Sequence, residues 1–200
     1  MKNIVITGGI GSGKSSVCKY LEDHGFRVVY ADKMARELTS SGGKAIPYII
    51  DNFGVEYIKP DGSMDRNKIR ELVYNNPNAM ELLEKGTTLV VKNQIDDIRK
   101  SATEKGEHVL FYEIPLFFEN DNKDTYDSCW LVTADIETRI SRVIKRDNQS
   151  REYVLKVINK QMPDEEKIKL ADEVIYNEGS LSALYERINY LLVKYKLINQ

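Results

Sequence analysis

Cysteine is scarce in this sequence, which holds only Cys18 and Cys129 among its 200 residues. The two lie far apart in the chain and form no C-x-x-C pair, so neither a disulfide framework nor a zinc site is predicted. This usage is typical of a reducing compartment, and we expect a cytoplasmic protein.

Long hydrophobic runs are also missing. The richest apolar stretch, residues 109–118, is interrupted by Glu113 and Pro115, whereas a membrane-spanning helix needs ~20 predominantly apolar residues. The apolar run at residues 4–6 is too short for the core of a signal peptide. We therefore expect a soluble chain that has no membrane partner.

Neither sign of charge dominates, since 29 lysine and arginine residues face 31 aspartate and glutamate residues. A protein that coats DNA or RNA is usually basic, so nucleic acid is not expected as a partner, and no obligate protein partner is implied. A hydrophobic fraction of 42% over 200 residues is enough for one domain with a substantial core.

Short apolar runs alternate with helical patterns along the chain. The β-branched run at 4–6 is followed by glycines and is typical of a buried strand. Further strands are expected at 27–30, 108–114, 128–133 and 173–176. Strands that alternate with helices form a parallel sheet through crossover connections. The expected fold is therefore α/β, with a five-stranded parallel sheet flanked by helices.

Residues from about 41 to 105 hold no convincing strand, and we interpret them as a helical lobe inserted into one domain of 200 residues. The expected core comprises residues 1–40, 106–138 and 171–200, and a lid is expected over about 139–165.

The most informative motif lies between the first expected strand and the first expected helix. Residues 8–15 read Gly-Gly-Ile-Gly-Ser-Gly-Lys-Ser and fit G-x-x-x-x-G-K-[ST], the P-loop, at every fixed position. The glycines let backbone N–H groups turn toward phosphates, and the following helix adds partial positive charge. Lys14 is expected to reach the β- and γ-phosphates of ATP, and Ser15 to offer its hydroxyl to Mg²⁺. The residues expected to bind the nucleotide in this loop are Gly9, Gly11, Ser12, Gly13, Lys14, Ser15 and Ser16.

Two other interpretations of this loop are a glycine-rich turn without a ligand and a dinucleotide-binding turn. The Lys-Ser pair favours phosphate binding, although Asp32 lies near the place where a dinucleotide-binding fold keeps its ribose ligand. Asp32 follows the second expected strand, and the carboxyl ends of parallel strands gather at one edge of a sheet. Asp32 is therefore a candidate general base for an acceptor hydroxyl; the alternative is that it caps the next helix.

A GTPase is disfavoured, because none of the Asn-Lys pairs is followed by Asp at the spacing that guanine recognition needs. The D-x-x-G match at 51–54 lies at an expected helix end rather than after a strand. The helix expected over 135–147 instead carries Arg139, Arg142 and Arg146 on one face. Because arginine forks neutralise charge on a transferred phosphoryl group, this segment is expected to form the lid over ATP. A solvated helix face is the other interpretation.

Glu113 ends the third expected strand. An acid beside a P-loop can hold Mg²⁺ through water or contact the acceptor, and a salt-bridged strand end is the alternative.

Taken in order, these residues resemble the dephospho-coenzyme A kinase family over nearly the whole chain. The matching segments are 7–15, 31–32 with 35–38, Gly62 with 65–66 and 69–73, 114–119, Arg142 with 146–147, and 171–175 with Asn177 and 179–180. The P-loop is shared by many families, whereas Ala-Asp-x-x-Ala-Arg at 31–36 and Ile-Pro-Leu-x-Phe-Glu at 114–119 are specific to this one.

The resemblance implies transfer of the ATP γ-phosphate to the ribose 3′-hydroxyl of dephospho-coenzyme A, the last step of coenzyme A biosynthesis. The catalytic residues that it implies are Asp32 as base, Lys14 and Arg142. It places Arg142 and Arg146 on the phosphates of ATP and Asn177 near the adenine. It places Arg36, Arg66 and Arg70 on the acceptor side with the base Asp32, and Glu113 joins the expected acceptor-binding residues because of its place at the strand end.

Three departures from the family pattern stand out. Tyr30 replaces the first acid of a frequent Asp-Ala-Asp, a usual His-Pro pair is Thr88-Leu89 here, and Glu113 stands where Asp is frequent. Another small nucleoside or nucleotide kinase and a non-catalytic ATP-binding switch remain the alternatives.

Overall fold

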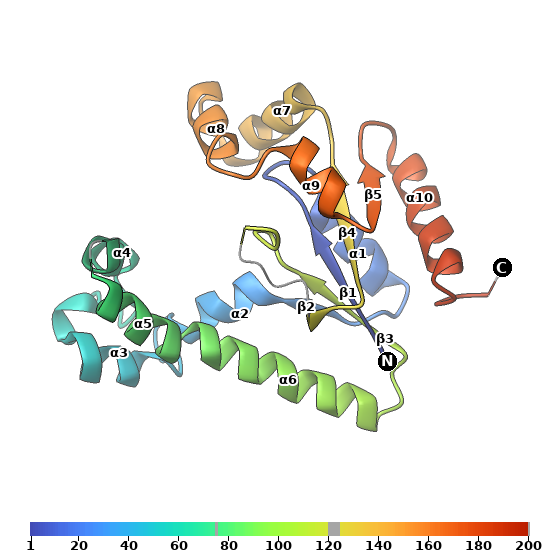
Figure 1. Ribbon diagram of the computed structural model, residues 1–200. Coiled ribbons are helices and arrows are strands. Elements are labelled where there is room, and N and C mark those ends of the chain that lie inside the picture. Colours follow the sequence, from blue (N-terminus) through green and yellow to red (C-terminus); the bar gives the residue numbers. More distant parts are fainter. Residues whose placement is uncertain (75, 120–124, 200) are drawn as a thin grey trace. The chain divides into compact units, whose positions relative to one another are not determined.

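The computed structural model describes residues 1–74, 76–119 and 125–199. The chain divides into two compact units, Met1–Val29 with Lys105–Gln200, and Tyr30–Glu104 (Figure 1). The first unit is therefore built from two separate stretches of chain, and the second from one continuous stretch.

The first unit is organised by a five-stranded sheet. Its strands are β1 (Lys2–Thr7), β2 (Val28–Tyr30), β3 (Val109–Glu113), β4 (Ser128–Thr133) and β5 (Glu173–Tyr176), in the order β2-β3-β1-β4-β5. The central strand β1 pairs in parallel with β3 and β4, and β4 pairs in parallel with β5. The side chains of residues 4–6 are 0% exposed, as expected for a strand covered on both faces. The expected five-stranded parallel sheet is confirmed.

Five helices complete this unit among the residues that the structure describes. They are α1 (Lys14–Asp23), α7 (Ile136–Asp147), α8 (Arg151–Ile158), α9 (Asp164–Leu170) and α10 (Leu181–Lys194). Helix α1 contacts β1, β3 and α10, and α9 contacts β4. Helix α1 ends at its cap His24, and Gly25 directly after it has a φ of +83°, which is typical of a residue that follows a helix.

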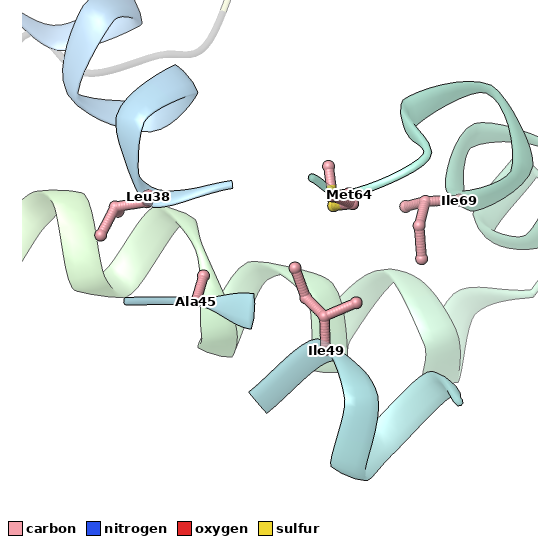
Figure 2. Packing of buried hydrophobic residues seen from close by; sticks show 5 residues of the cluster. All are labelled: Leu38, Ala45, Ile49, Met64 and Ile69. Atoms are coloured by element: carbon pink, nitrogen blue, oxygen red, sulfur yellow. The ribbon is translucent and has the colours of Figure 1, made fainter. Parts of the chain in front are cut away.

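The second unit is helical. It contains α2 (Ala31–Leu38), α3 (Ile46–Phe53), a 3-10 helix η1 (Val55–Tyr57), α4 (Arg66–Tyr74), α5 (Pro77–Gly86) and α6 (Thr88–Glu104). A small core of Leu38, Ala45, Ile49, Met64 and Ile69 lies between these elements (Figure 2). The lobe is expected from about residue 41, and the compact unit of the structure also includes α2, which packs on α6.

The capping role considered for Asp32 is wrong. Helix α2 already begins at Ala31, with Tyr30 at the N-cap position, and Asp32 lies inside its first turn. The reason is that α2 begins directly after β2, earlier than a cap at Asp32 requires, so that Tyr30, the last residue of the strand, takes the N-cap position. An acid in the first turn is still favourable, because it faces the positive end of the helix dipole.

Within the described part of the chain, no helix combines the length and the apolar character that a membrane crossing needs.

A buried ion pair connects α9 with the segment that follows β3. Lys167 is 1% exposed, and its Nζ lies 3.1 Å from Oε1 of Glu119. The same oxygen accepts a hydrogen bond from the Met162 backbone N–H at 3.0 Å. Glu119 is the last residue of the Ile-Pro-Leu-x-Phe-Glu motif, so the ion pair ties the end of this motif to α9.

Replacing Lys167 with methionine is expected to lower the free energy of unfolding by about 3–5 kcal/mol, because the Glu119 carboxylate then lacks its buried partner. Urea denaturation measures this loss. The double variant Lys167→Met/Glu119→Gln removes both charges and is expected to recover most of it. Lys169→Met, which replaces an exposed lysine on the same helix, is the matched control. Equal small losses at both lysines would show that the buried pair contributes nothing.

Candidate active site

The P-loop connects β1 to α1 through a turn that contains glycines with positive φ. Gly11 and Gly13 have φ values of +76° and +99°, which residues with a Cβ rarely adopt. Gly13 is the N-cap residue of α1, and no side chain caps the first turn there. The first N–H groups of α1 are therefore available to an anion at the positive end of the helix.

Lys14 is held against this loop. Its Nζ donates hydrogen bonds to the carbonyl oxygens of Gly8 at 2.6 Å and Gly9 at 3.1 Å. Burial lowers the pKa of Lys14 from its ordinary value, and the charge of Glu113 partly opposes this shift. A phosphate in the loop would offer this desolvated ammonium better acceptors than two peptide carbonyls.

A cavity of about 350 Å³ opens beside the loop. The predicted site residues that line it are Gly11, Gly13, Lys14, Ser15, Ser16, Glu113, Arg142, Arg146 and Asn177. They come from the P-loop, α1, the end of β3, α7 and the segment after β5, so the first unit brings together positions spread over most of the sequence. Gly179, Leu181 and Leu184 line the same cavity, and only the Gly-Ser pair before α10 hinted at them.

Two residues of the predicted nucleotide-binding set do not line this cavity. Ser12 is 0% exposed, and its Oγ has no hydrogen-bond partner among the described residues. Gly9 packs so closely against the guanidinium of Arg139 that a Cβ built on Gly9 would overlap it. Both residues are buried and do not face the cavity, so they contribute to the packing of the loop.

The three arginines of α7 have different environments. Arg142 lines the cavity and donates from one amino group to the Asn177 carbonyl at 2.8 Å. Its other amino group is buried without a hydrogen-bond partner among the described residues, and is free for a ligand. Arg146 is exposed and paired with Asp147 at 2.7 Å, which raises the pKa of Arg146. Arg139 is only 4% exposed, so the solvated-face interpretation is wrong for this residue.

Asn177 connects the end of β5 with the P-loop. Its Nδ2 donates to the backbone carbonyl of Ser12 at 2.9 Å, and the side chain is buried. A Cβ on Gly13 would overlap this nitrogen, so the glycine also makes room for the asparagine. The segment after β5 is thereby fixed beside the cavity next to the P-loop.

Four predicted residues lie in the second unit, Asp32, Arg36, Arg66 and Arg70. Asp32, Arg36 and Arg70 are exposed on α2 and α4. Arg66 donates to the Thr39 hydroxyl at 2.7 Å and so ties the start of α4 to the end of α2. Their roles toward an acceptor remain predictions.

The site has oxygen donors of the kind that Mg²⁺ prefers. Ser15 in the first turn of α1 and Glu113 at the end of β3 line the same cavity. The described residues hold no cluster of three or more histidine, cysteine or acidic side chains that could bind a metal. This donor set fits a metal that takes most of its ligands from phosphate oxygens and water, as Mg²⁺ does in nucleotide sites.

Comparisons with known proteins agree with this geometry. The model of the dephospho-CoA kinase family matches residues 3–183. A dephospho-CoA kinase from Carboxydothermus hydrogenoformans is 37% identical over 193 residues, covering 96% of this chain and 94% of that protein. A crystal structure of a protein from Thermus thermophilus superposes with a TM-score of 0.80 at 32% identity, over 96% of this chain and 97% of the other.

A solved dephospho-CoA kinase from Campylobacter jejuni is also similar, with a TM-score of 0.68 at 26% identity and 98% coverage of both chains. The resemblance that the P-loop, the Ala-Asp-x-x-Ala-Arg segment and the Ile-Pro-Leu-x-Phe-Glu segment indicate is thus confirmed over nearly the whole length. This chain belongs to the dephospho-CoA kinase family.

Proposed function

We propose that this chain transfers the γ-phosphate of ATP to the ribose 3′-hydroxyl of dephospho-CoA and so produces CoA and ADP. The observation that carries the proposal is the cavity in which the P-loop, Arg142 and Asn177 converge, in a chain of the dephospho-CoA kinase family. Phosphoryl transfer needs positioned cations and N–H donors rather than covalent chemistry by the protein, and this cavity offers both.

The nucleotide lies along the P-loop in this mechanism. N–H groups of the loop and the start of α1 hold the β- and γ-phosphates, and Lys14 exchanges its carbonyl partners for phosphate oxygens. The unpartnered amino group of Arg142 stabilises the negative charge of the transferred phosphoryl group in this mechanism. Arg146 adds a second cation at the rim, and Asn177 fixes the segment beside the adenine.

Mg²⁺ is held in the proposal by the Ser15 hydroxyl, with Glu113 acting through water. When bound, the metal neutralises charge on the β- and γ-phosphates.

Asp32 is the proposed base, and the second unit is the proposed acceptor lobe with Arg36, Arg66 and Arg70 as its anion-binding residues. The acceptor 3′-oxygen forms a bond to the γ-phosphorus while the bond from that phosphorus to the β–γ bridging oxygen breaks. ADP leaves with the electron pair of the broken bond, and the hydroxyl proton passes to the carboxylate of Asp32.

Residues 139–165 form the proposed lid over ATP. The proposed location of the protein is the cytoplasm.

An ADP-release assay with and without dephospho-CoA tests the function. We expect turnover that depends on the acceptor, and a product with one more phosphate at the 3′ position. Slow hydrolysis that ignores the acceptor would indicate an ATP-binding switch, and turnover with adenosine or a nucleoside monophosphate instead would indicate another small kinase.

Replacing Arg142 with alanine is expected to lower kcat more than ATP affinity, because its free amino group acts on charge that grows in the transition state. One such donor is worth about 2.7–4 kcal/mol in comparable sites. Steady-state kinetics with both substrates measures the split, and Lys145→Ala, which removes an exposed cation from the same helix, is the control. A change in the KM for ATP alone would make Arg142 a ground-state binder.

A further inference from the structure

Side chains from outside the P-loop form hydrogen bonds with both backbone groups of Ile10, a residue of this loop. The carbonyl of Ile10 accepts a hydrogen bond from Nε of Arg139 at 2.9 Å. The N–H of Ile10 donates to Oε1 of Gln161 at 3.0 Å. Both backbone groups of Ile10 are thus engaged with side chains more than one hundred positions away in the sequence, and the Ile10 N–H is not left for a phosphate.

Arg139 is itself held in one orientation. One of its amino groups donates to Oδ2 of Asp164 at 2.7 Å, and the same oxygen accepts from the Thr133 hydroxyl at 2.6 Å. Arg139 is 4% exposed, and an arginine fork bound at two edges is far more rigid than a lysine ammonium. Thr133 ends β4 and Asp164 begins α9, so the contact between Arg139 and the loop is connected to the sheet through these two residues.

The P-loop and α7 are in close contact near Arg139. A Cβ on Gly11 would lie 2.5 Å from the backbone carbonyl oxygen of Arg139, and a Cβ on Gly9 would lie 3.1 Å from Oε1 of Gln161. Arg139 does not line the nucleotide cavity; it lines a separate cavity of about 650 Å³ beside α7 and α9. Arg139 is therefore a buried cation of α7 that contacts the backbone of the loop, and it can act on nucleotide binding through the conformation of that loop.

We propose that Arg139 is a positioning residue for nucleotide binding: with Asp164 and Gln161 it clamps Ile10, and so keeps the P-loop in its phosphate-binding conformation. The clamp is these three side chains together. It deepens the proposed kinase function, since the loop that it holds is the one that carries the phosphates. Arg139 and Arg142, three residues apart on α7, thereby have different tasks, the first on the loop and the second on the reacting group.

The test measures ADP affinity by calorimetry, and amide hydrogen exchange of residues 9–13, in Arg139→Gln, Asp164→Asn and the double variant. We expect each single change to weaken ADP binding about tenfold, the effect of one charge-assisted hydrogen bond. The double variant is expected to bind no more weakly than either single one, because both substitutions disable the same contact. Exchange in the loop is expected to rise while that of β4 stays unchanged, and the KM for ATP to rise without a change in the KM of the acceptor.

Two further variants keep the test decisive. Gln161→Ala leaves no buried charge unpaired and is expected to speed exchange at the loop even if the charged variants fold poorly. Glu137→Gln breaks an exposed ion pair with Arg151 that also starts on α7, and is expected to change neither readout.

Three results would overturn the inference. If Asp164→Asn binds ADP as well as or better than the unchanged protein while Arg139→Gln binds it weakly, Arg139 contacts the phosphates directly. If the variants lose only thermal stability and keep their affinity, the ion pair serves the fold alone. Unchanged loop exchange in Gln161→Ala would remove that residue from the clamp. Because ADP binding needs no acceptor, the expected pattern would stand even if dephospho-CoA proved not to be the substrate.

Discussion

Replacing Lys14 with alanine is expected to abolish measurable phosphoryl transfer, with a loss in kcat of at least about 10²–10³-fold, the range for one preorganised charge-stabilising donor. The ammonium lies beside the loop carbonyls of Gly8 and Gly9, where the terminal phosphates are expected, and no other lysine lines the cavity among the described residues. Acceptor-dependent ADP release at saturating ATP measures the effect.

The matched control is Lys19→Ala, which removes an exposed lysine from the same helix. Lys14 makes hydrogen bonds within the loop, so its removal also frees two carbonyls; these can turn to water, and the fold is expected to persist by circular dichroism. Turnover near that of the Lys19→Ala variant would remove the P-loop lysine from the mechanism.

The lowered pKa of Lys14 gives the same experiment a pH dependence. Burial disfavours the ammonium, so free protein loses this proton at a lower pH than an ordinary lysine does. Bound phosphates favour the ammonium, and ATP affinity is therefore expected to fall as the pH rises through the lowered pKa. Lys14→Arg keeps its charge at every accessible pH and is expected to lack this alkaline decline. An identical decline in both proteins would assign it to another group.

Replacing Asp32 with asparagine is expected to lower kcat by about 10²–10⁴-fold, the usual contribution of a general base, while ATP affinity stays the same. Asparagine is nearly isosteric but cannot accept the hydroxyl proton. Asp32 makes no cap bond to α2, so the substitution removes only the interaction of the acid with the helix dipole, worth about 0.3–1 kcal/mol. A thermal melt paired with steady-state kinetics on dephospho-CoA separates the two effects.

Asp51→Asn is the control for this variant, because Asp51 is an exposed acid on α3 in the same unit. If Asp32→Asn keeps its specific activity, whatever its melting temperature, the mechanism needs another base.

Local sequence patterns predicted the parts of this protein that local chemistry determines. The P-loop could be located because the strand, the glycines and the helix follow one another within a few residues. The five strands could be found for the same reason. The start of α2 could not, because nothing in the residues themselves shows that β2 and α2 join without a loop.

The different environments of the Arg139 and Arg142 side chains could not be predicted from the sequence. Helical spacing puts both on one face of α7, yet one is buried against Asp164 and the other opens onto the nucleotide cavity. The difference is set by which element packs over each, and helical periodicity does not contain that information. Asn177 beside Ser12 is similar: family resemblance can imply a contact across 165 positions, but residue spacing alone cannot predict one.

The division of the first unit into two stretches of chain has a consequence for its synthesis on the ribosome. Strand β1 is made first and lies between β3 and β4, whose residues follow more than one hundred positions later. The helical second unit is continuous and can fold as soon as it emerges, since domains fold as units during translation. The apolar residues of β1 therefore lack one or both neighbouring strands until synthesis has passed Thr133, the last residue of β4. The strand that precedes the P-loop is thus a part of the nascent chain that is exposed to aggregation during synthesis.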